Sequence, residues 1–368
     1  MSTDYSGGKE YGALAAVSID LLYEGMEVEE DIFDFTAAAL LVGGGETLTS
    51  SQIEKLREVN QYREVIHVTG KTYRSLIEKS PPPMPFVRQE LEEATGYAAA
   101  KDKARGMLNT ITHKQTVEPG AISSITSIIS NQLEVLCPST IVSLVNAPSP
   151  ADEYIMRHCI NVSLLNGLFG RWLGLPKSET DKLVLMGLVH DCGTAIMPAK
   201  ILNAPRKLTL AEYEVVKMHS MYGYELLSKF PEPVRLVSRS HHERAGGEGY
   251  PDHLSQENIP LEARITAVSD VYVAMVSQRT YRKSSSPFHI MAKLDELKDS
   301  ALDARLVAVF NQRMPFELLN KLVLMSDGSV GVVRAFDPND IEYPVVEVDG
   351  RALKSGEGWH CVSMYDIL

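Results

Sequence analysis

The stretch from His241 to Pro251 constrains this chain more than any other, because it joins two adjacent histidines to a glycine-rich turn that closes on Tyr-Pro. Neighbouring imidazoles can both reach one metal ion where the backbone leaves a helix and turns, since their side chains then converge. Gly246, Gly247 and Gly249 permit such a turn. An exposed polar loop with two surface histidines is the alternative. The remainder of the chain decides between the two interpretations.

Further residues of the metal-ligand type lie on successive segments that are predicted as helices. They are His158, His190, Asp191, His219 and Asp270. Each one alone fits a buried hydrogen-bonded residue or a turn residue. Together with His241 and His242 they supply nitrogen and oxygen ligands for two metal ions, with positions left for water. Two ions about 3.5–4 Å apart activate water and neutralise charge on a phosphoryl transition state, so the series favours metal-dependent phosphoester chemistry.

Composition narrows the classes of function. A net charge of −12 over 368 residues argues against a nucleic-acid binder held by basic patches. Four scattered cysteines without a CxxC pair argue against a disulfide framework and against a thiolate zinc site. No apolar run approaches the roughly 20 residues of a membrane span, and the polar N-terminus lacks the pattern of a signal peptide. We therefore expect a cytoplasmic protein without a membrane span.

Shifts in composition and in hydrophobic period predict four parts. Residues 1–80 are predicted as a small α/β regulatory domain, and residues 81–148 as a linker with connecting helices. Residues 149–315 are predicted as a helical metal domain, and residues 316–368 as a small β cap. The proline-rich stretch Ser80–Pro85 marks a stiff boundary, because proline cannot continue a helix. The expected fold class is mainly α, with a small α/β domain before the bundle and a small β subdomain after it.

Local signals place several elements. Thr49 and Gln52 predict a capping box at a helix start in the N-terminal part. Turn residues at 326–329 and at Asp349-Gly350 separate short runs of valine and leucine, which predicts hairpins near the C-terminus. Both regions are expected to be structural or regulatory rather than chemical.

The metal domain is predicted to consist of capped helices. Residues 122–145 form one long amphipathic run, predicted as a packing helix or a homodimer helix. Ser149–Asp152 is a strong helix start for the segment that carries His158. Thr209 is predicted to cap a helix that bears His219. Further helices are expected over residues 179–189, 234–242 and 265–276.

Two motifs carry a family resemblance. His190-Asp191-Cys192-Gly193 resembles the HD signature of the HD phosphohydrolase superfamily. His241-His242-Glu243-Arg244, followed by Gly249-Tyr250-Pro251, resembles the HD-GYP branch of that superfamily, the bacterial cyclic di-GMP phosphodiesterases. The resemblance spans about residues 150–315. The stretch from Gly25 to Thr49 is similar to a module often found ahead of this domain.

The resemblance implies an HD-type helical bundle around two divalent metal ions, with Fe or Mn expected and Zn, Ni and Co as alternatives. By motif position one ion would be held by His158, His190, Asp191 and Asp270. The second would be held by His219, His241 and His242, with Asp191 bridging, and Asp191 and His190 are the expected catalytic residues. Members with three metals have a glutamate where Tyr154 stands here, and Glu153 points about 100° away on a helix. Two metals are therefore expected.

The resemblance also implies substrate and partner contacts. Arg279 and Arg282 match positions that contact substrate phosphate, although a solvated basic helix end is the alternative. Tyr250 and Thr194 are expected beside the substrate. The Gly249–Pro251 loop would shape the site and could contact GGDEF-domain proteins.

The sequence departs from the family pattern at three positions. Thr194 stands where the family usually has lysine, while Gly246 and Val273 stand where it usually has aspartate. Loss of the lysine removes a cation near the phosphate, which can cost orders of magnitude in rate. Three hypotheses follow: hydrolysis of cyclic di-GMP to pGpG and further to GMP, a degenerate sensor that binds cyclic di-GMP without appreciable hydrolysis, and hydrolysis of another cyclic dinucleotide such as cyclic GMP-AMP.

Overall fold

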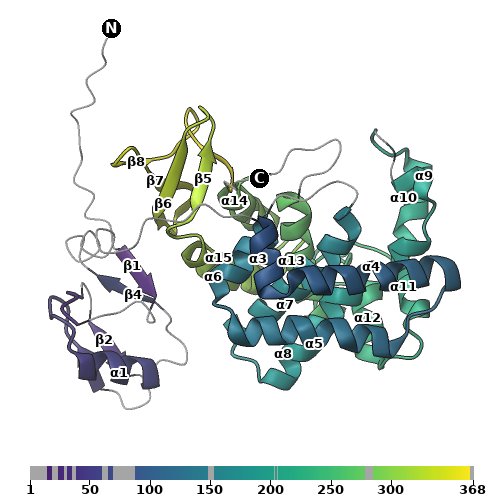
Figure 1. The fold of residues 1–368 in the computed structure, drawn as a ribbon, viewed down its shortest axis with the longest axis horizontal. Coiled ribbons are helices and arrows are strands. Elements are labelled where there is room, and N and C mark those ends of the chain that lie inside the picture. The colour runs from purple at the N-terminus through teal and green to yellow at the C-terminus, as the bar shows by residue number, and fades with distance from the viewer. Residues whose placement is uncertain are drawn as a thin grey trace, which may run out of the picture. The chain divides into compact units, whose positions relative to one another are not determined.

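The chain divides into two compact units, Met1–Pro82 and Pro83–Leu368. Within them the computed structural model describes residues 15–18, 24–28, 31–34, 39–59, 65–68, 88–147, 153–202, 204, 206–277 and 285–364 (Figure 1). Three predicted features lie outside the described residues: the proline-rich boundary, the helix start at Ser149, and the substrate arginines Arg279 and Arg282.

The described part of the first unit contains two antiparallel strand pairs and a helix. They are β1 (Ala15–Ser18) with β4 (Val65–Val68), β2 (Ile32–Asp34) with β3 (Ala39–Val42), and α1 (Ser50–Val59). The predicted capping box is confirmed. The Thr49 N–H donates to Gln52 Oε1 at 2.9 Å, and the Gln52 N–H donates to Thr49 Oγ1 at 3.3 Å. Ile53 and Leu56 bury one face of the helix.

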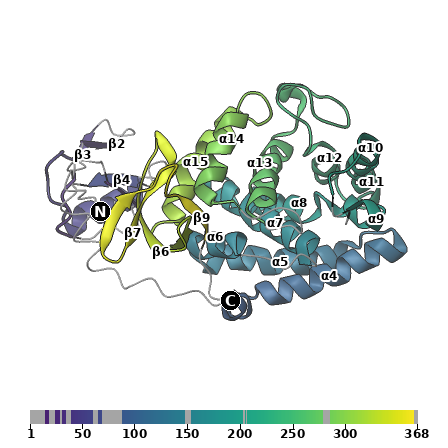
Figure 2. The same cartoon turned by 90° about the horizontal axis from the view of Figure 1, so that it is seen from above.

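The second unit is mainly helical, which confirms the predicted fold class (Figure 2). Over its described residues the α-helices are α3 (Arg88–Thr95), α4 (Tyr97–Lys114), α5 (Pro119–Val135), α6 (Pro138–Asn146), α7 (Tyr154–Trp172), α8 (Lys177–Val189), α9 (Ala199–Leu202), α10 (Leu210–Lys217), α11 (His219–Leu226), α12 (Glu232–Ser240), α13 (Leu261–Val276), α14 (Pro287–Leu297) and α15 (Ala304–Glu317). Two 3₁₀ helices join them, η3 (Cys192–Ile196) and η4 (Gln256–Asn258). No described helix has the length and apolar character that crossing a bilayer requires.

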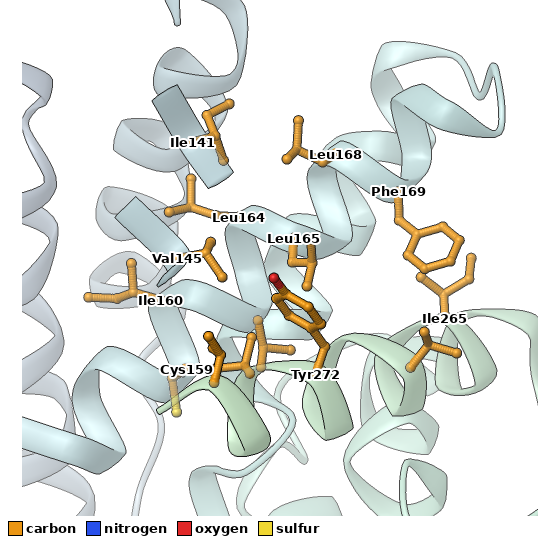
Figure 3. Close-up of a cluster of buried hydrophobic side chains, with 14 of the residues drawn as sticks. Ile141, Val145, Cys159, Ile160, Leu164, Leu165, Leu168, Phe169, Ile265 and Tyr272 are labelled. Atoms are coloured by element: carbon orange, nitrogen blue, oxygen red, sulfur yellow. The ribbon is translucent and has the colours of Figure 1, made fainter. Parts of the chain in front are cut away.

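Helix α7 is buried around nearly its whole circumference, as expected for a helix inside a core. It packs against α5, α6, α8 and α13. Figure 3 shows side chains of α6, α7 and α13 meeting there, among them Phe169 and Tyr272. The Tyr272 hydroxyl donates to Asn146 Oδ1 at 2.8 Å, so this buried group is satisfied. Gly187 of α8 permits close packing, because a Cβ there would lie 2.7 Å from the Ser163 Cα.

Two helices that the sequence predicts as continuous are broken. The single helix over residues 122–145 is wrong: Leu136 and Cys137 separate α5 from α6. Pro138 cannot donate an N–H and disfavours helical backbone in the residue before it, so Cys137 is extended with ψ 150°.

The predicted helix from Thr209 through His219 is also wrong, because α10 ends at Lys217 and α11 begins at His219. The cap itself is confirmed, since Thr209 and Glu212 form a complete capping box. The break places His219 on a separate short helix, where its side chain is buried.

A five-stranded antiparallel sheet ends the second unit. In spatial order its strands are β8 (Arg351–Lys354), β7 (Asp340–Val348), β6 (Val330–Asp337), β5 (Leu322–Met325) and β9 (Cys361–Met364). Both predicted turns are present, and Gly328 and Gly350 have φ values of 86° and 75°, which glycine adopts without strain. The sheet packs against α14, so the predicted β subdomain is confirmed as part of the fold.

Candidate metal centre

Helix ends deliver most of the predicted ligands to one place. His190 follows the last turn of α8 and precedes Asp191, His241 follows α12 and precedes His242, and His219 begins α11. His158 and Asp270 come from within α7 and α13. A helix end lets two consecutive side chains leave in related directions, which a continuing helix does not allow.

One group, the first trio, consists of His158, His190 and Asp270. Their ligand atoms all lie within 4.8 Å of one another. His158 Nε2 is 3.0 Å from Asp270 Oδ1, and His190 Nε2 is 4.0 Å from the same oxygen. All three residues are buried, and the carboxylate lies beside two imidazoles.

A second group, the second trio, consists of His219, His241 and His242, with ligand atoms again within 4.8 Å of one another. Asp191 lies at its edge, with Oδ1 3.4 Å from His219 Nε2, and this oxygen also accepts a hydrogen bond from the Thr194 hydroxyl. His242 Nδ1 is 4.0 Å from Asp270 Oδ2. The two trios are therefore adjacent parts of one cluster.

Backbone carbonyls hold three of the imidazoles. The Nδ1 atoms of His190, His219 and His241 lie 2.7, 2.6 and 2.9 Å from the carbonyl oxygens of Gly187, Val216 and Ser238, each three positions earlier in the chain. A carbonyl can only accept, so Nδ1 carries the proton and Nε2 presents a lone pair. Those three Nε2 atoms are buried and have no hydrogen-bond partner among the described residues.

Burial decides the charge of several ligands. It lowers the pKa of His190, and lowers that of His241 to about 3, because a charged imidazole would lose its water. Burial also lowers the pKa of His242, and the adjacent His241 lowers it further. Burial alone would raise the pKa of Asp270, but the hydrogen bond from His158 and the electrostatic effect of His158, His242 and His190 together outweigh it, and the pKa lies well below its usual range. Neutral imidazoles around ionised carboxylates form a donor set that suits divalent cations.

Ser238 connects the two trios. Its carbonyl accepts from His241 Nδ1 at 2.9 Å, and its hydroxyl donates to the His190 carbonyl at 2.8 Å. The surrounding backbone approaches closely at two glycines. A Cβ on Gly223 would lie 2.1 Å from Ser238 Oγ, and one on Gly193 would lie 2.0 Å from the His219 carbonyl oxygen. Larger residues at either glycine would push the helices that carry the ligands apart.

The loop after His242 is fixed by Glu243. This buried carboxylate accepts hydrogen bonds from the N–H groups of Asp252 and Leu254 at 2.7 and 3.0 Å. The Tyr250 ring consequently stacks on His242, with centroids 4.8 Å apart and planes at 29°. Burial raises the pKa of Tyr250, so its phenol keeps the proton and remains a donor.

Tyr154 and Glu153 have different surroundings. The Tyr154 ring stacks on His158, with centroids 5.5 Å apart. Glu153 instead bonds Arg157 at 2.8 Å, and also Lys101 and Arg105 at 3.3 Å. Since these cations engage its carboxylate, Glu153 is directed away from the trios.

The cluster opens into a cavity of about 900 Å³, within the range of ligand-binding pockets. Predicted residues that line it are His158, Asp191, Thr194, His219, His242, Tyr250 and Asp270. The sequence interpretation did not identify Arg105, Leu108 and Asn109 of α4, Tyr213 of α10, or Arg244. The spacing of the three α4 residues places them on one face of a helix, and this could have been seen in the sequence. No local feature of the sequence indicates that this face lies beside the HD segment.

Comparisons with known proteins place this geometry in context. Residues 144–306 match a family model described as HD domain. The chain is 32% identical over 269 residues to a cyclic di-GMP phosphodiesterase of Pseudomonas aeruginosa, covering 71% of this chain and 64% of that protein. It is 30% identical over 169 residues to a 3′3′-cGAMP-specific phosphodiesterase of Vibrio cholerae, covering 45% of this chain and 32% of that protein. The chain thus spans less than two thirds of either relative.

A solved structure supports the fold. An HDGYP protein from Bdellovibrio bacteriovorus superposes with a TM-score of 0.51 at 13% identity, covering 82% of this chain and 100% of that one. At this identity the likeness concerns the helical architecture alone.

Proposed function

We propose that the chain is a metal-dependent phosphodiesterase of the HD-domain family, which hydrolyses cyclic di-GMP to pGpG and further to GMP. The resemblance read from its HD and GYP motifs is confirmed by the family match and the relatives. The substrate is proposed from the name of the Pseudomonas relative and from a cavity large enough for a nucleotide.

The buried Nε2 atoms of His190, His219 and His241 carry this proposal, because they lack hydrogen-bond partners among the described residues. Leaving a buried polar atom unpaired costs free energy, and a cation coordinated by these lone pairs removes that cost. We assign one ion to the first trio and a second ion to the second trio, with Asp191 between them. The Tyr154 ring occupies the position beside His158, which supports two ions rather than three.

The ions would supply positive charge against the phosphate and a water of lowered pKa. Asp191, with one oxygen engaged by the Thr194 hydroxyl, accepts the water proton at its other oxygen. The water oxygen then bonds to phosphorus while the P–O3′ bond breaks, and the proton passes to the departing 3′ oxygen. Tyr250 donates its phenol proton as a hydrogen bond to a phosphate oxygen. Arg279 and Arg282 remain proposed phosphate contacts.

The test is a coupled metal and turnover measurement. Protein is loaded with Fe or Mn under reducing conditions, metal content is determined, and cyclic di-GMP is assayed by product chromatography. His289→Ala is the matched control, because that half-exposed histidine pairs with Glu342 outside the cluster. Two bound ions without turnover would contradict the proposed reaction.

A second candidate function is a sensor that binds cyclic di-GMP and metal but does not cleave. The Thr194 hydroxyl donates its hydrogen bond to Asp191, and threonine has no positive charge that could contact a phosphate. At the second departure, a Cβ on Gly246 would lie 2.9 Å from the Ser300 carbonyl oxygen, so a larger side chain has little room there. Nucleotide binding without hydrolysis, combined with loss of metal in His190→Ala, would favour the sensor over the enzyme.

A third candidate is hydrolysis of cyclic GMP-AMP, which the name of the Vibrio relative supports. A panel of cyclic dinucleotides compared by kcat/KM separates it from the first. We further propose Fe or Mn as the native metal and a cytoplasmic location. Contact of the Gly249–Pro251 loop with GGDEF-domain proteins and a homodimer are proposed from the sequence alone. Metal analysis of protein from native cells tests the proposed native metal. Sedimentation of the purified chain tests the proposed homodimer.

A further inference from the structure

Helix α4 lines the cavity although it precedes residues 144–306, the segment that matches the HD domain. Figures 1 and 2 show it running from α3 toward the end of the unit where α9 to α11 lie. Three of its side chains face the cavity: Arg105, Leu108 and Asn109. Because these positions are three and four residues apart, they share one face of the helix.

The adjoining face of α4 is buried and anchors the helix. Tyr97, Ala104 and Ile111 are buried against α5 and α7. The Thr112 hydroxyl donates to the Ala195 carbonyl at 3.0 Å, next to the HD turn. Lys101 pairs with Glu153 at 3.3 Å, at the start of α7. The three cavity-facing residues lie between these two anchors, so they are presented on a fixed support.

Arg105 can exchange its present partners for a ligand. Its side chain is 51% exposed and pairs with Asp102 at 3.1 Å and with Glu153 at 3.3 Å. Exposed ion pairs of this kind contribute little free energy. Glu153 keeps Arg157 and Lys101 when Arg105 leaves, and Asp102, whose side chain is 71% exposed, is then solvated by water. The neighbouring Asn109 is exposed, and its amide has no hydrogen-bond partner in the part of the chain that the structure describes.

We propose that Arg105, Leu108 and Asn109 form a guanine-selective subsite for the half of the cyclic dinucleotide that is not being cleaved. This inference rests on the proposed function. A guanidinium donates two parallel hydrogen bonds to guanine O6 and N7, whereas adenine presents an amino donor where guanine has O6. The Leu108 side chain covers the apolar face of the base, and the Asn109 amide is free to bond the base edge. Ions held by the two trios would contact the phosphate, and the α4 residues contact the base.

The test compares cyclic di-GMP with cyclic di-AMP on the full-length, metal-loaded protein. Arg105→Ala should raise KM for cyclic di-GMP by about 10- to 100-fold, the range for loss of one bidentate base contact, with kcat changed less than about threefold. The values for cyclic di-AMP should stay within about threefold. Arg105→Lys, which keeps the charge but loses the fork, should behave like alanine. Lys103→Ala is the control, an exposed cation of the same helix that does not line the cavity.

Several results would overturn the subsite. An equal loss for both nucleotides would make Arg105 a general phosphate contact, and rescue by Arg105→Lys would say the same. An unchanged KM in Arg105→Ala would remove it from binding altogether. Where turnover is too slow to measure, equilibrium binding of the two nucleotides gives the same ratios. A wild-type protein that neither binds nor cleaves either nucleotide would refute the proposed function itself, which is a distinguishable outcome.

Cyclic GMP-AMP provides a second readout. If guanine occupies the α4 subsite, the two linkages are presented unequally to the metals, and the wild type should open mainly one of them. Arg105→Ala should open both at more similar rates. Chromatography separates the two linear products. An equal mixture from the wild type would contradict guanine selection by α4 even if cyclic di-GMP were cleaved well.

Discussion

The first trio is drawn from α7, α8 and α13, which are helices of the buried core, whereas the second trio comes from α11 and the end of α12. Their charges also differ. Asp270 gives the first trio a carboxylate that is already 3.0 Å from His158. The second trio contains three imidazoles, and its nearest carboxylate in the cluster, Asp191, is 3.4 Å from His219. We infer that the first trio binds an ion more tightly, while the second depends more on its ion to satisfy buried nitrogen atoms.

Removing one ligand from each trio should produce the largest effects. His190→Ala and His241→Ala each leave an ion without a buried ligand, so turnover should fall by at least about 10²-fold, as it does when a charge-stabilising group is deleted. The first variant should lose the tighter ion and the second variant the weaker one. Metal content at limiting and at saturating metal distinguishes the two. Equal metal loss in both variants would remove the proposed asymmetry.

Graded chelation should separate the ions in the wild-type protein. We expect the second-trio ion to leave at a lower chelator concentration than the first-trio ion. Each ion present at about 100 times its Kd adds about 2.7 kcal/mol to the free energy of unfolding. Calorimetric unfolding across a chelator series should therefore show two steps of decreasing midpoint. A single step would mean that the two trios act as one indivisible site.

The pH dependence of the chelated protein tests the histidines themselves. Burial holds the folded-state pKa of His190, His241 and His242 below the unfolded value of about 6.5, so protonation favours unfolding. The stability that they permit is complete above that value and is lost as the pH falls below it. At one pH unit below the unfolded-state pKa, each imidazole that stays neutral in the folded protein lowers the free energy of unfolding by about 1.4 kcal/mol.

His241 is one of these three histidines, whereas the pKa of Asp270 lies well below this pH range. His241→Gln should therefore flatten the dependence of stability on pH between pH 7 and 5 more than Asp270→Asn does. Denaturant unfolding in chelator measures this, and His289→Gln serves as the exposed control. A profile that is flat in the wild type would show that these imidazoles are not held neutral.

Ser238→Ala should have the smallest and most selective effect. It deletes the hydroxyl bond to the His190 carbonyl but keeps the carbonyl that holds His241. We expect a loss of about 1 kcal/mol of stability, and metal affinity about 10-fold weaker in the first trio only. Ser163→Ala is the matched control, because it removes a similar buried bond, to the Val184 carbonyl, away from the ligands. Equal weakening of both ions by Ser238→Ala would contradict this division.

Much of the centre could be predicted because ligand chemistry is local. His190 and Asp191 are adjacent, and so are His241 and His242. The sequence also shows that a helix ends near each pair. The mainly helical fold followed from hydrophobic period and caps. The grouping into trios remains a proposal for the metal: each trio has its ligand atoms within 4.8 Å of one another, and Asp191, predicted to bridge the ions, belongs to neither group.

Other features could not be predicted from local signals. The break at Met218 overrides a continuous apolar pattern, because packing determines whether a helix turns there. The break before Pro138 is different, because it follows from the local chemistry of proline and was readable in the sequence. The contribution of Arg105 depends on α4 lying beside a turn more than 80 residues later in the chain, through the bond from Thr112 to Ala195. Such contacts are set by the tertiary fold, and no periodicity in the sequence encodes them.

The anchoring of His190, His219 and His241 by main-chain carbonyls has an evolutionary consequence. A point mutation can delete a side chain but cannot delete a carbonyl, so the aim of these imidazoles is inherited with the helices themselves. Side chains proposed to contact the nucleotide, such as that of Thr194, have no such protection. Substitutions among the side chains that line the cavity can therefore abolish catalysis in a related protein that still binds metal.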